Sequence, residues 1–268
     1  MRDNHRVEKK RFLIVNADDF GFSQPINEGV CEAHQKGIVT DASLLVRSPY
    51  ARHALDLAQK ASLPVGLHID FVTPFAQSEA PEFGPNGRLL HELFAREYKK
   101  KIRGQLTSEE LIKIRQEIRR QIEDFRQMAG RLPSHLDYHF GLHFLPDVMA
   151  IYLFVAEEYR LPVRWGVQYA GRNPLVLAPA RLCDRFRGLE QGSVDLFLSL
   201  LQEHWHGVLE ILCHPGHITP EGLADSYNRE REYELQALTQ PGLKAEIEAM
   251  GIELVNYDWL NANQSSDL

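Results

Sequence analysis

The residues best suited to chemistry lie in four short segments of the chain. The segment SHLDYHFGLH, from Ser134 to His143, holds three histidines and one aspartate. The other segments are NADD at 16–19, GLH at 66–68 and HPG at 214–216. Imidazole and carboxylate groups bind divalent metal ions, and imidazole transfers protons near neutral pH. Each segment follows an apolar run and precedes a predicted turn, which is where a parallel α/β barrel carries its active site.

The spacing within SHLDYHFGLH fits a strand. Side chains alternate along a strand, so His135, Asp137 and His139 would share one face. On a helix, His135, His139 and His143 would instead form a stripe at every fourth residue. Pro133 just before the segment and the strand–helix rhythm of the chain favour the strand.

Each segment also has an ordinary structural interpretation. Asp18 and Asp19 could cap the helix that follows them, because aspartate is favoured at helix N-caps. His68 could be a hydrogen-bonded core histidine, and HPG could be a turn. All four segments, however, fall at the same predicted edge of one sheet, and buried carboxylates and imidazoles are costly without a metal or hydrogen bonds. Together they predict a site.

The elements that position these residues alternate between strand and helix. Apolar runs predict strands at 12–15, 38–46 and 63–70, with helices at 25–36, before Gly37, and at 51–60. After an irregular stretch at 71–106, Thr107 and Glu110 predict a capping box for a helix that ends near Gly130. Later strands are predicted in SHLDYH, PVRWG, LEILC and IELVNY, and helices at 194–203, 227–238, 243–250 and from Pro146.

About seven mostly parallel strands, with an irregular region at 167–192, predict a single α/β domain. A distorted (β/α) barrel of the TIM type fits the length of 268 residues, and a doubly wound open sheet is the alternative. The domain is expected to span 1–268, with residues 1–10 and 262–268 as flexible tails.

Composition excludes several classes of protein. The net charge of −7 argues against a nucleic-acid surface. Cys31, Cys183 and Cys213 are far apart and form no CxxC pair, which is typical of a reducing compartment. No apolar run is long enough for a membrane span, and no apolar stretch of signal-peptide type follows the charged first residues. A cytoplasmic protein is expected.

Five motifs in the same order resemble the YdjC/ChbG carbohydrate deacetylase family (ChbG/HpnK-type). They are NADDFG, VTDASLLV, VGLH, SHLDYH with the later His143, and HPG. The resemblance extends from Phe12 to the segment SYNREREYEL. It implies a distorted (β/α) barrel, metal-dependent deacetylation of N-acetylated sugars such as chitooligosaccharides, and a possible homodimer.

The resemblance also implies roles for individual residues. Asp19, His68 and His139 match the family's ligands for a divalent metal ion, Mg²⁺ or Zn²⁺. Asp18 matches the general base, and His214 matches the general acid. A bound metal would lower the pKa of a water molecule and polarise the acetyl carbonyl. His135 and Asp137 are then expected to orient the ligands.

The chain departs from the family pattern after His139. Common members have the run His-His-His-x-His, whereas this chain has Phe140-Gly141-Leu142 before His143. Phe140 would stack on a sugar or fill the core, and His143 remains a second-shell or substrate candidate. Tyr227 and Arg229 match substrate-side positions of the family, although an exposed helix start explains them equally well. His204 and His206 match no role.

Two other functions fit the same residues. The same metal centre could hydrolyse a different amide or an ester. A sugar-binding or regulatory barrel without turnover is the alternative from another class. The joint presence of a base, an acid and metal ligands favours an enzyme, since a pure binding protein needs only some of them.

Overall fold

The computed structural model describes residues 10–71, 73, 107–139, 146–164, 178–179, 181–218 and 227–263. Its strands are β1 (Arg11–Phe20), β2 (Asp41–Leu44), β3 (Val65–Ile69), β4 (Leu136–Tyr138), β5 (Arg181–Cys183), β6 (Gly207–Cys213) and β7 (Ile252–Leu254). Its helices are α1 (Gln24–Lys36), α2 (Ala51–Ala61), α4 (Ser108–Ala129), α5 (Pro146–Tyr159), α6 (Ser193–Leu201), α7 (Asn228–Leu238), α8 (Leu243–Ala249) and α9 (Tyr257–Ala262).

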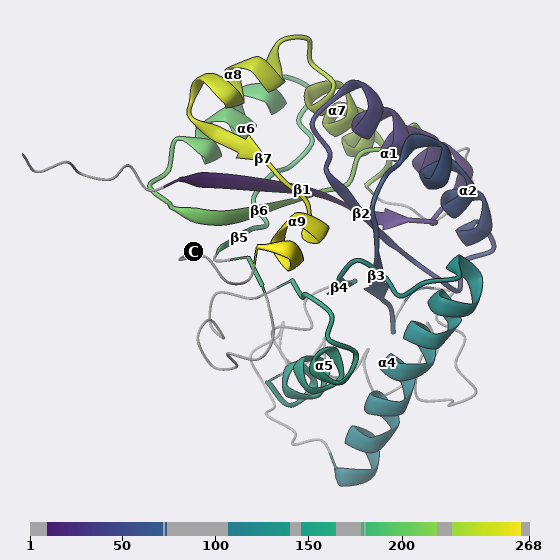
Figure 1. Ribbon diagram of the computed structural model, residues 1–268. Helices are drawn as coiled ribbons and strands as arrows, with labels where there is room; N and C mark the ends of the chain where they lie inside the picture. The colour runs from purple at the N-terminus through teal and green to yellow at the C-terminus, as the bar shows by residue number, and fades with distance from the viewer. Residues whose placement is uncertain are drawn as a thin grey trace, which may run out of the picture.

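All seven described strands form one parallel sheet, in which six follow the order β4-β3-β2-β1-β6-β5 and β7 pairs with β1 outside this order. The long strand β1 is at its centre. Along one edge β1 pairs with β6, and along the other it pairs with β7 near its start and with β2 near its end. The sheet curls, with helices on its outer side (Figure 1). The prediction of a single distorted (β/α) barrel is therefore confirmed, and the open doubly wound sheet is not adopted.

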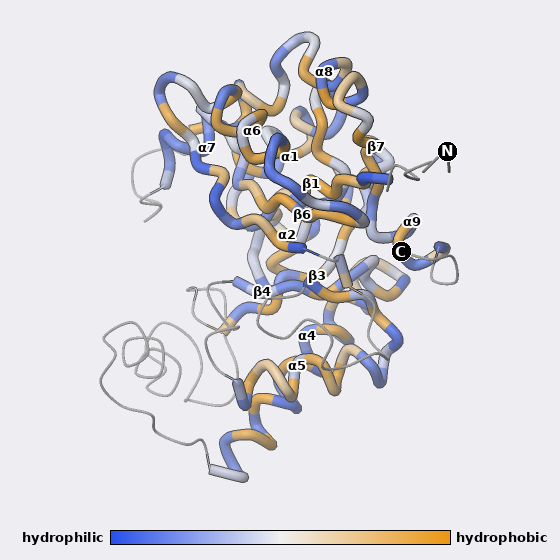
Figure 2. The backbone as a smooth tube through the Cα atoms, turned by 90° about the vertical axis from the view of Figure 1, so that its left-hand side faces the viewer, coloured by the Kyte–Doolittle hydropathy of each residue, from blue (hydrophilic) through white to orange (hydrophobic). Residues whose placement is uncertain are grey.

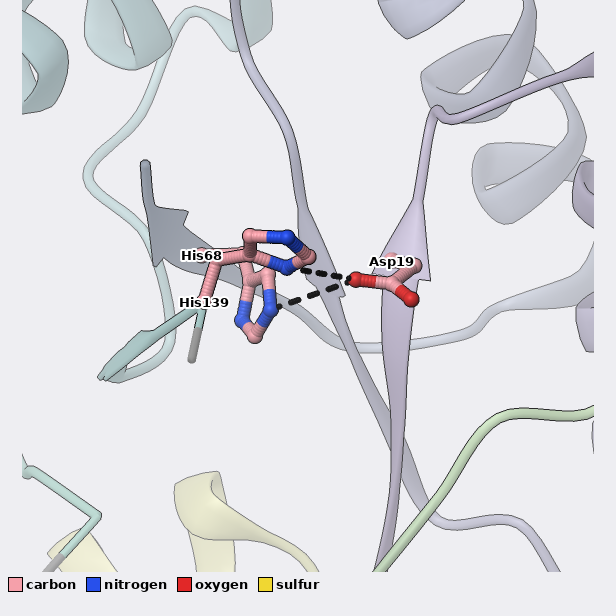
Figure 3. Close-up of side chains that lie close together, drawn as sticks. All are labelled: Asp19, His68 and His139. Carbon is pink, nitrogen blue, oxygen red and sulfur yellow. Dashed lines mark hydrogen bonds and ion pairs between the residues drawn. The ribbon is translucent and has the colours of Figure 1, made fainter. Parts of the chain in front are cut away.

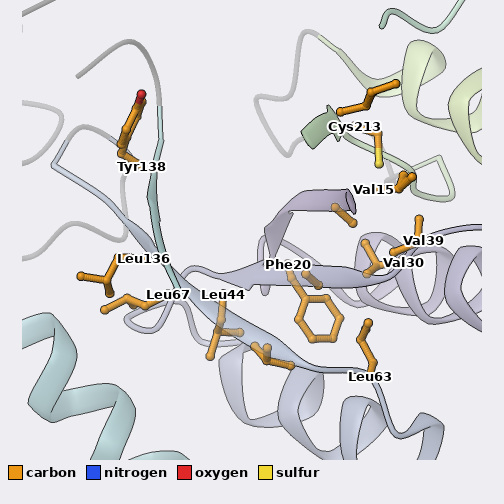
Figure 4. Close-up of a cluster of buried hydrophobic side chains, with 14 of the residues drawn as sticks. Val15, Phe20, Val30, Val39, Leu44, Leu63, Leu67, Leu136, Tyr138 and Cys213 are labelled. Atoms are coloured by element: carbon orange, nitrogen blue, oxygen red, sulfur yellow. The ribbon is translucent and has the colours of Figure 1, made fainter. Parts of the chain in front are cut away.

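The apolar residues of β1 face two cores because side chains alternate along the strand. Leu13, Val15 and Ala17 pack in the larger core between the sheet and the outer helices, and Figure 4 shows Val15 among the side chains of this core. Phe12 and Ile14 point to the other side, where they pack with residues of α9. The helix α9 lies within the curve of the sheet (Figure 1) and fills the interior of the barrel at the amino-terminal ends of the strands.

The outer helices α1, α2 and α4 are amphipathic and end where local sequence predicts. Hydrophobic and hydrophilic residues alternate along α4, whereas β1 and β6 carry mainly hydrophobic residues through the middle of the molecule (Figure 2). The capping box of Thr107 and Glu110 is present, and Gly130 ends α4 in the left-handed conformation. Ser23 caps α1, whose first turn contains Pro25. These helix boundaries follow the predictions closely.

Four predictions about elements and their bounds differ from the structure. Within the predicted strand PVRWG, Val163 makes only an isolated bridge to Leu136, and the residues from 165 on lie outside the described ranges. The short strand β5 lies within the stretch 167–192 that was expected to be irregular. The predicted strand IELVNY stops at Leu254, because Asn256 caps α9 by accepting a hydrogen bond from the Trp259 N–H. Ala262, predicted to begin a tail, is the last residue of α9.

Most of the stretch 71–106 lies outside the described ranges, as do residues 1–9 and 264–268. Within the described ranges, no helix combines the length and the apolar composition that a membrane-spanning segment requires.

Candidate metal centre

The site begins at the carboxyl end of β1, where the backbone changes direction. Asp19 has a φ of 62°, a left-handed conformation that is uncommon for residues other than glycine. The pairing of β1 with β2 is irregular between Ala17 and Phe20, as in a β-bulge. Because the regular alternation is broken here, Asp18 and Asp19 do not simply point to opposite faces of the sheet. Both carboxylates are buried in the site region.

Asp19, His68 and His139 converge from three strand ends. The Asp19 Oδ1 atom lies 3.0 Å from His139 Nδ1 and 3.4 Å from His68 Nε2. Figure 3 shows the two imidazoles facing this one carboxylate oxygen. His68 belongs to β3, and His139 follows β4, where its backbone N–H donates to the Ile69 carbonyl. The fold thus brings together three side chains that are widely separated in the sequence.

This donor set fits a divalent metal ion. One atom from each of the three residues lies within 4.8 Å of the other two. Ligand atoms at zinc distances of about 2.0–2.2 Å in a tetrahedral site lie about 3.4 Å from one another, close to the observed contacts. Two imidazole nitrogens and a carboxylate oxygen suit Zn²⁺ and other divalent ions.

A buried carboxylate orients the first imidazole. His68 pairs with Asp137 in the register of β3 and β4, and its Nδ1 atom lies 2.7 Å from Asp137 Oδ1. Asp137 Oδ2 accepts hydrogen bonds from Ser43 and Asn16. Burial lowers the pKa of His68, but Asp137 and Asp19 together hold it well above its ordinary value. This carboxylate–histidine arrangement directs Nε2 toward Asp19, as in many metal sites.

The second oxygen of Asp19 has a cationic partner. Arg231, on α7, donates a hydrogen bond of 2.7 Å to Asp19 Oδ2. Burial raises the pKa of Asp19, but the guanidinium of Arg231 and the imidazole of His139 hold it well below its ordinary value. Asp19 is therefore ionised, with Oδ2 bound to Arg231 and Oδ1 facing the two imidazoles.

Asp18 has a different environment, dominated by a fully buried arginine. Two nitrogens of Arg164 donate to the two oxygens of Asp18, each over 2.7 Å. The same guanidinium lies 2.8 Å from Glu210 and 3.1 Å from Asp137. Such a bidentate pair fixes the carboxylate plane. Asp18, His68 and Asp137 also offer ligand atoms within 4.8 Å of one another, but Arg164 occupies both carboxylates, so the first group suits a cation better.

His214 follows β6 beside the end of β1. The register pairs Ala17 with Cys213, so Asp18 and His214 leave adjacent strands at the same level. The backbone N–H of His214 donates to Glu234, and its ring lies edge-on to Tyr227, with centroids 5.6 Å apart. The structure thus brings the backbones of His214 and Asp18 to the same level of adjacent strands, and it packs Tyr227 against the His214 ring.

The other predicted residues have varied surroundings. His135 is fully buried and stacks on the Tyr257 ring, and its Nε2 atom lies 3.9 Å from Asp137. A Cβ at Gly66 would lie 2.3 Å from the His135 ring, so this close approach requires glycine.

Among the remaining predicted residues, Arg229 is exposed on α7. His143 and Phe140 lie outside the described ranges, and His204 and His206 are exposed.

Four charged residues of the site had no assigned role in the sequence. They are Arg164, Glu210, Arg231 and Glu234, all of them buried. A charged residue inside an apolar strand is a usable signal, since burying it needs a partner. Glu210 within VLEILC and Arg164 within PVRW carry that signal. Arg231 and Glu234 do not, because α7 has many charged residues and its buried face is apparent only in the fold.

The fold and the site define a curled parallel α/β barrel with imidazoles and carboxylates converging at the carboxyl ends of its strands. A model of the YdjC-like protein family matches residues 12–249, and the chain belongs to this family. The resemblance that the motifs predicted is therefore confirmed.

Relatives match over nearly their whole length. The chain is 35% identical to the carbohydrate deacetylase of Geobacillus stearothermophilus, with 92% of this chain and 97% of that protein covered. It is 33% identical to the chitooligosaccharide deacetylase of Serratia marcescens, with 92% and 98% covered. A crystal structure of an Enterococcus faecalis V583 protein, described as a candidate cellobiose-phosphate cleavage protein, superposes with a TM-score of 0.73 at 26% identity, covering 94% of this chain and 99% of that one.

Proposed function

We propose that the chain is a metal-dependent hydrolase that removes the acetyl group from N-acetylated sugars, with chitooligosaccharides as the leading substrate class. The enzyme class, a carbohydrate deacetylase, agrees with the names of the curated relatives. The observation that carries the metal dependence is the convergence of Asp19 Oδ1, His68 Nε2 and His139 Nδ1. A divalent ion bound there would acidify water and polarise the acetyl carbonyl.

Asp18 is the proposed general base. Both of its oxygens accept hydrogen bonds from Arg164, and Oδ2 keeps a further lone pair that can accept a proton from the attacking water. Asn16 also donates to Asp18 Oδ1 over 2.9 Å. These hydrogen bonds hold the carboxylate in one orientation, so the proton transfer needs no rearrangement of the base.

His214 is the proposed general acid. Amide hydrolysis expels an amine, which is a poor leaving group unless its nitrogen is protonated. An imidazole delivers that proton effectively because its ordinary pKa lies near neutral pH. The register of β1 and β6 supports this pairing of acid and base, because His214 and Asp18 follow paired residues of the two strands.

Acetate release tests the proposal. Protein stripped by a chelator and reloaded with Zn²⁺ or Mg²⁺ would be incubated with N-acetylglucosamine, diacetylchitobiose and longer oligomers. We expect metal-dependent acetate from at least one of them. His206→Ala, which changes an exposed histidine, is the matched control for loss of activity in His139→Ala. Metal binding without acetate from any sugar would contradict the proposed substrate class and favour another amide or an ester.

A further inference from the structure

We propose that Glu234 is a positioning residue for His214 and that it acts together with Tyr227. This inference rests on the proposed function, in which His214 protonates the leaving amine. It adds a device that fixes the acid: one buried carboxylate on α7 that holds both the backbone of His214 and the aromatic ring beside its imidazole.

The contacts of Glu234 divide between its two oxygens. Oε2 accepts a hydrogen bond of 2.5 Å from the His214 backbone N–H, and Oε1 accepts one of 2.7 Å from the Tyr227 hydroxyl. The Tyr227 oxygen in turn accepts from the Gly188 N–H over 3.0 Å. Glu234 is fully buried, and a carboxylate in that position is costly unless its hydrogen bonds compensate. Burial raises the pKa of Glu234, although His214 and these hydrogen bonds oppose that rise.

The imidazole of His214 lacks the partner that usually orients a catalytic histidine. In triads of the serine-protease type, a carboxylate bonds to the ring nitrogen directly. Here the Nδ1 atom of His214 is buried and has no hydrogen-bond partner among the described residues. The direction of the ring is therefore set by its backbone and by the Tyr227 ring, which stands at 66° to it. Glu234 controls both.

Backbone hydrogen bonds hold the rest of the HPG turn, and among the described residues Glu234 is the one that binds the backbone of its first residue, His214. The Gly216 N–H donates to the Arg231 carbonyl, and the His217 N–H donates to the Pro25 carbonyl, each over 3.2 Å. A turn fixed at its far end by α1 and α7 would still pivot at His214 without the hydrogen bond to Glu234.

A double-mutant cycle tests the inference with the metal-loaded protein and diacetylchitobiose as substrate. We expect Glu234→Ala to lower kcat by about 100-fold, the usual contribution of a general acid, with little change in KM or in bound metal. Glu234→Gln keeps an oxygen acceptor and a similar shape, so it should recover most of that loss. In the His214→Ala background, Glu234→Ala should change kcat by less than about twofold, because residues that act as one unit are not additive.

Additive losses in the double variant, with the parent active, would overturn the role of Glu234 and leave the proposed function intact. A parent that releases no acetate would contradict the proposed function itself.

Tyr227→Phe provides a second variant in case Glu234→Ala fails to fold, since it removes only one hydroxyl. We expect about a tenfold loss of kcat that again disappears in the His214→Ala background, and Gln236→Ala, on the exposed side of α7, is the control. Equal losses from Tyr227→Phe in both backgrounds would also reject the proposal.

Discussion

Two adjacent aspartates at the end of β1 have different partners. Asp18 is bound through both oxygens by Arg164, whereas Asp19 turns one oxygen to Arg231 and the other to the two imidazoles. The left-handed backbone at Asp19 makes this division possible, because it lets two consecutive side chains enter the same site. Strained backbone of this kind is often found where function requires it.

Replacing the proposed base separates catalysis from metal binding. We expect Asp18→Asn to lower kcat for acetate release by about 100-fold or more, because an amide cannot accept the proton. Metal content, measured by mass spectrometry after dialysis, should remain near that of the parent, since Asp18 lies outside the ligand group. Retention of most activity in this variant would show that another residue is the base.

Replacing either ligand histidine should remove the metal, whereas replacing the base should leave it bound. We expect His68→Ala and His139→Ala to lower bound metal sharply, because each removes one of three converging ligand atoms. Asp137→Asn should weaken metal binding by about 10- to 100-fold through its effect on His68. Titration calorimetry with Zn²⁺ gives these affinities, and unchanged metal affinity in either alanine variant would remove that histidine from the ligand set.

At the level of elements, α1 and α7 hold the HPG turn between them. A Cβ on Gly29 of α1 would lie 2.6 Å from the Gly216 Cα atom. The backbones therefore approach as closely as glycine allows. This contact connects the first helix of the chain to the turn that carries His214.

A single methyl group tests that contact. We expect Gly29→Ala to displace the HPG turn, to reduce acetate release several-fold and to lower the free energy of unfolding by about 1–3 kcal/mol, as overpacking does. Enzyme assays and urea denaturation measure the two effects. Glu28→Ala, at an exposed position of the same helix, should change neither, and parent-like activity of Gly29→Ala would show that the turn tolerates the shift.

Sequence patterns predicted the long elements and some of the short ones, but they missed β5 and α9. Helices α1, α2 and α4 have strong periodicity and clear end signals, so their bounds differ from the predictions by a residue or two. β5 has only three residues. α9 begins after its cap Asn256, inside the run IELVNY that was predicted as a strand. Short elements such as these depend on tertiary contacts, which propensity does not contain.

The same limit applies to the site. The aspartates and histidines at the strand ends could be predicted because residue type, alternation and position coincide. The interior carboxylates and arginines could not be assigned, because their roles depend on which strands become neighbours. Arg164, for example, meets Asp18 across 146 residues of sequence.

Viewed as a whole, the barrel interior is built in layers. Apolar residues of β1 and α9 fill its amino-terminal end. A buried polar layer follows, in which Arg164, Asp137 and Glu210 are paired. The metal centre lies above it, at the carboxyl ends of the strands. Tyr257 of α9 joins the first two layers, since its hydroxyl donates to Glu210 over 2.8 Å and its backbone N–H donates to Asp41.

Asp41 makes the stability of the whole molecule depend on pH. Burial raises its pKa from an ordinary value of 3.8 to about 7, so the folded protein binds this proton more tightly than the unfolded chain. Its contribution therefore becomes less favourable as pH rises from about 4 to 7 and is constant above that range.

Asp41→Asn removes this dependence. We expect the stability of the variant relative to the parent to improve as pH rises from 5 to 8, by up to about 1.4 kcal/mol for each pH unit below the folded pKa. Urea denaturation at both pH values measures the difference, with Asp56→Asn, at an exposed position, as the control. A difference that does not change with pH would show that Asp41 ionises normally in the folded protein.

The position of α9 has a consequence for how the protein is made. A chain leaves the ribosome from its amino terminus, and β1, at the centre of the sheet, emerges first. The partners of Glu210 and Asp41 in α9 emerge more than two hundred residues later than β1. The hydrogen bonds of Tyr257 to Glu210 and Asp41 can form only after Tyr257 has been synthesised, so we expect these two carboxylates to stay hydrated until then. The interior of the barrel can therefore be completed only after α9 has been synthesised, and we expect a chain truncated before α9 to leave that interior open to water.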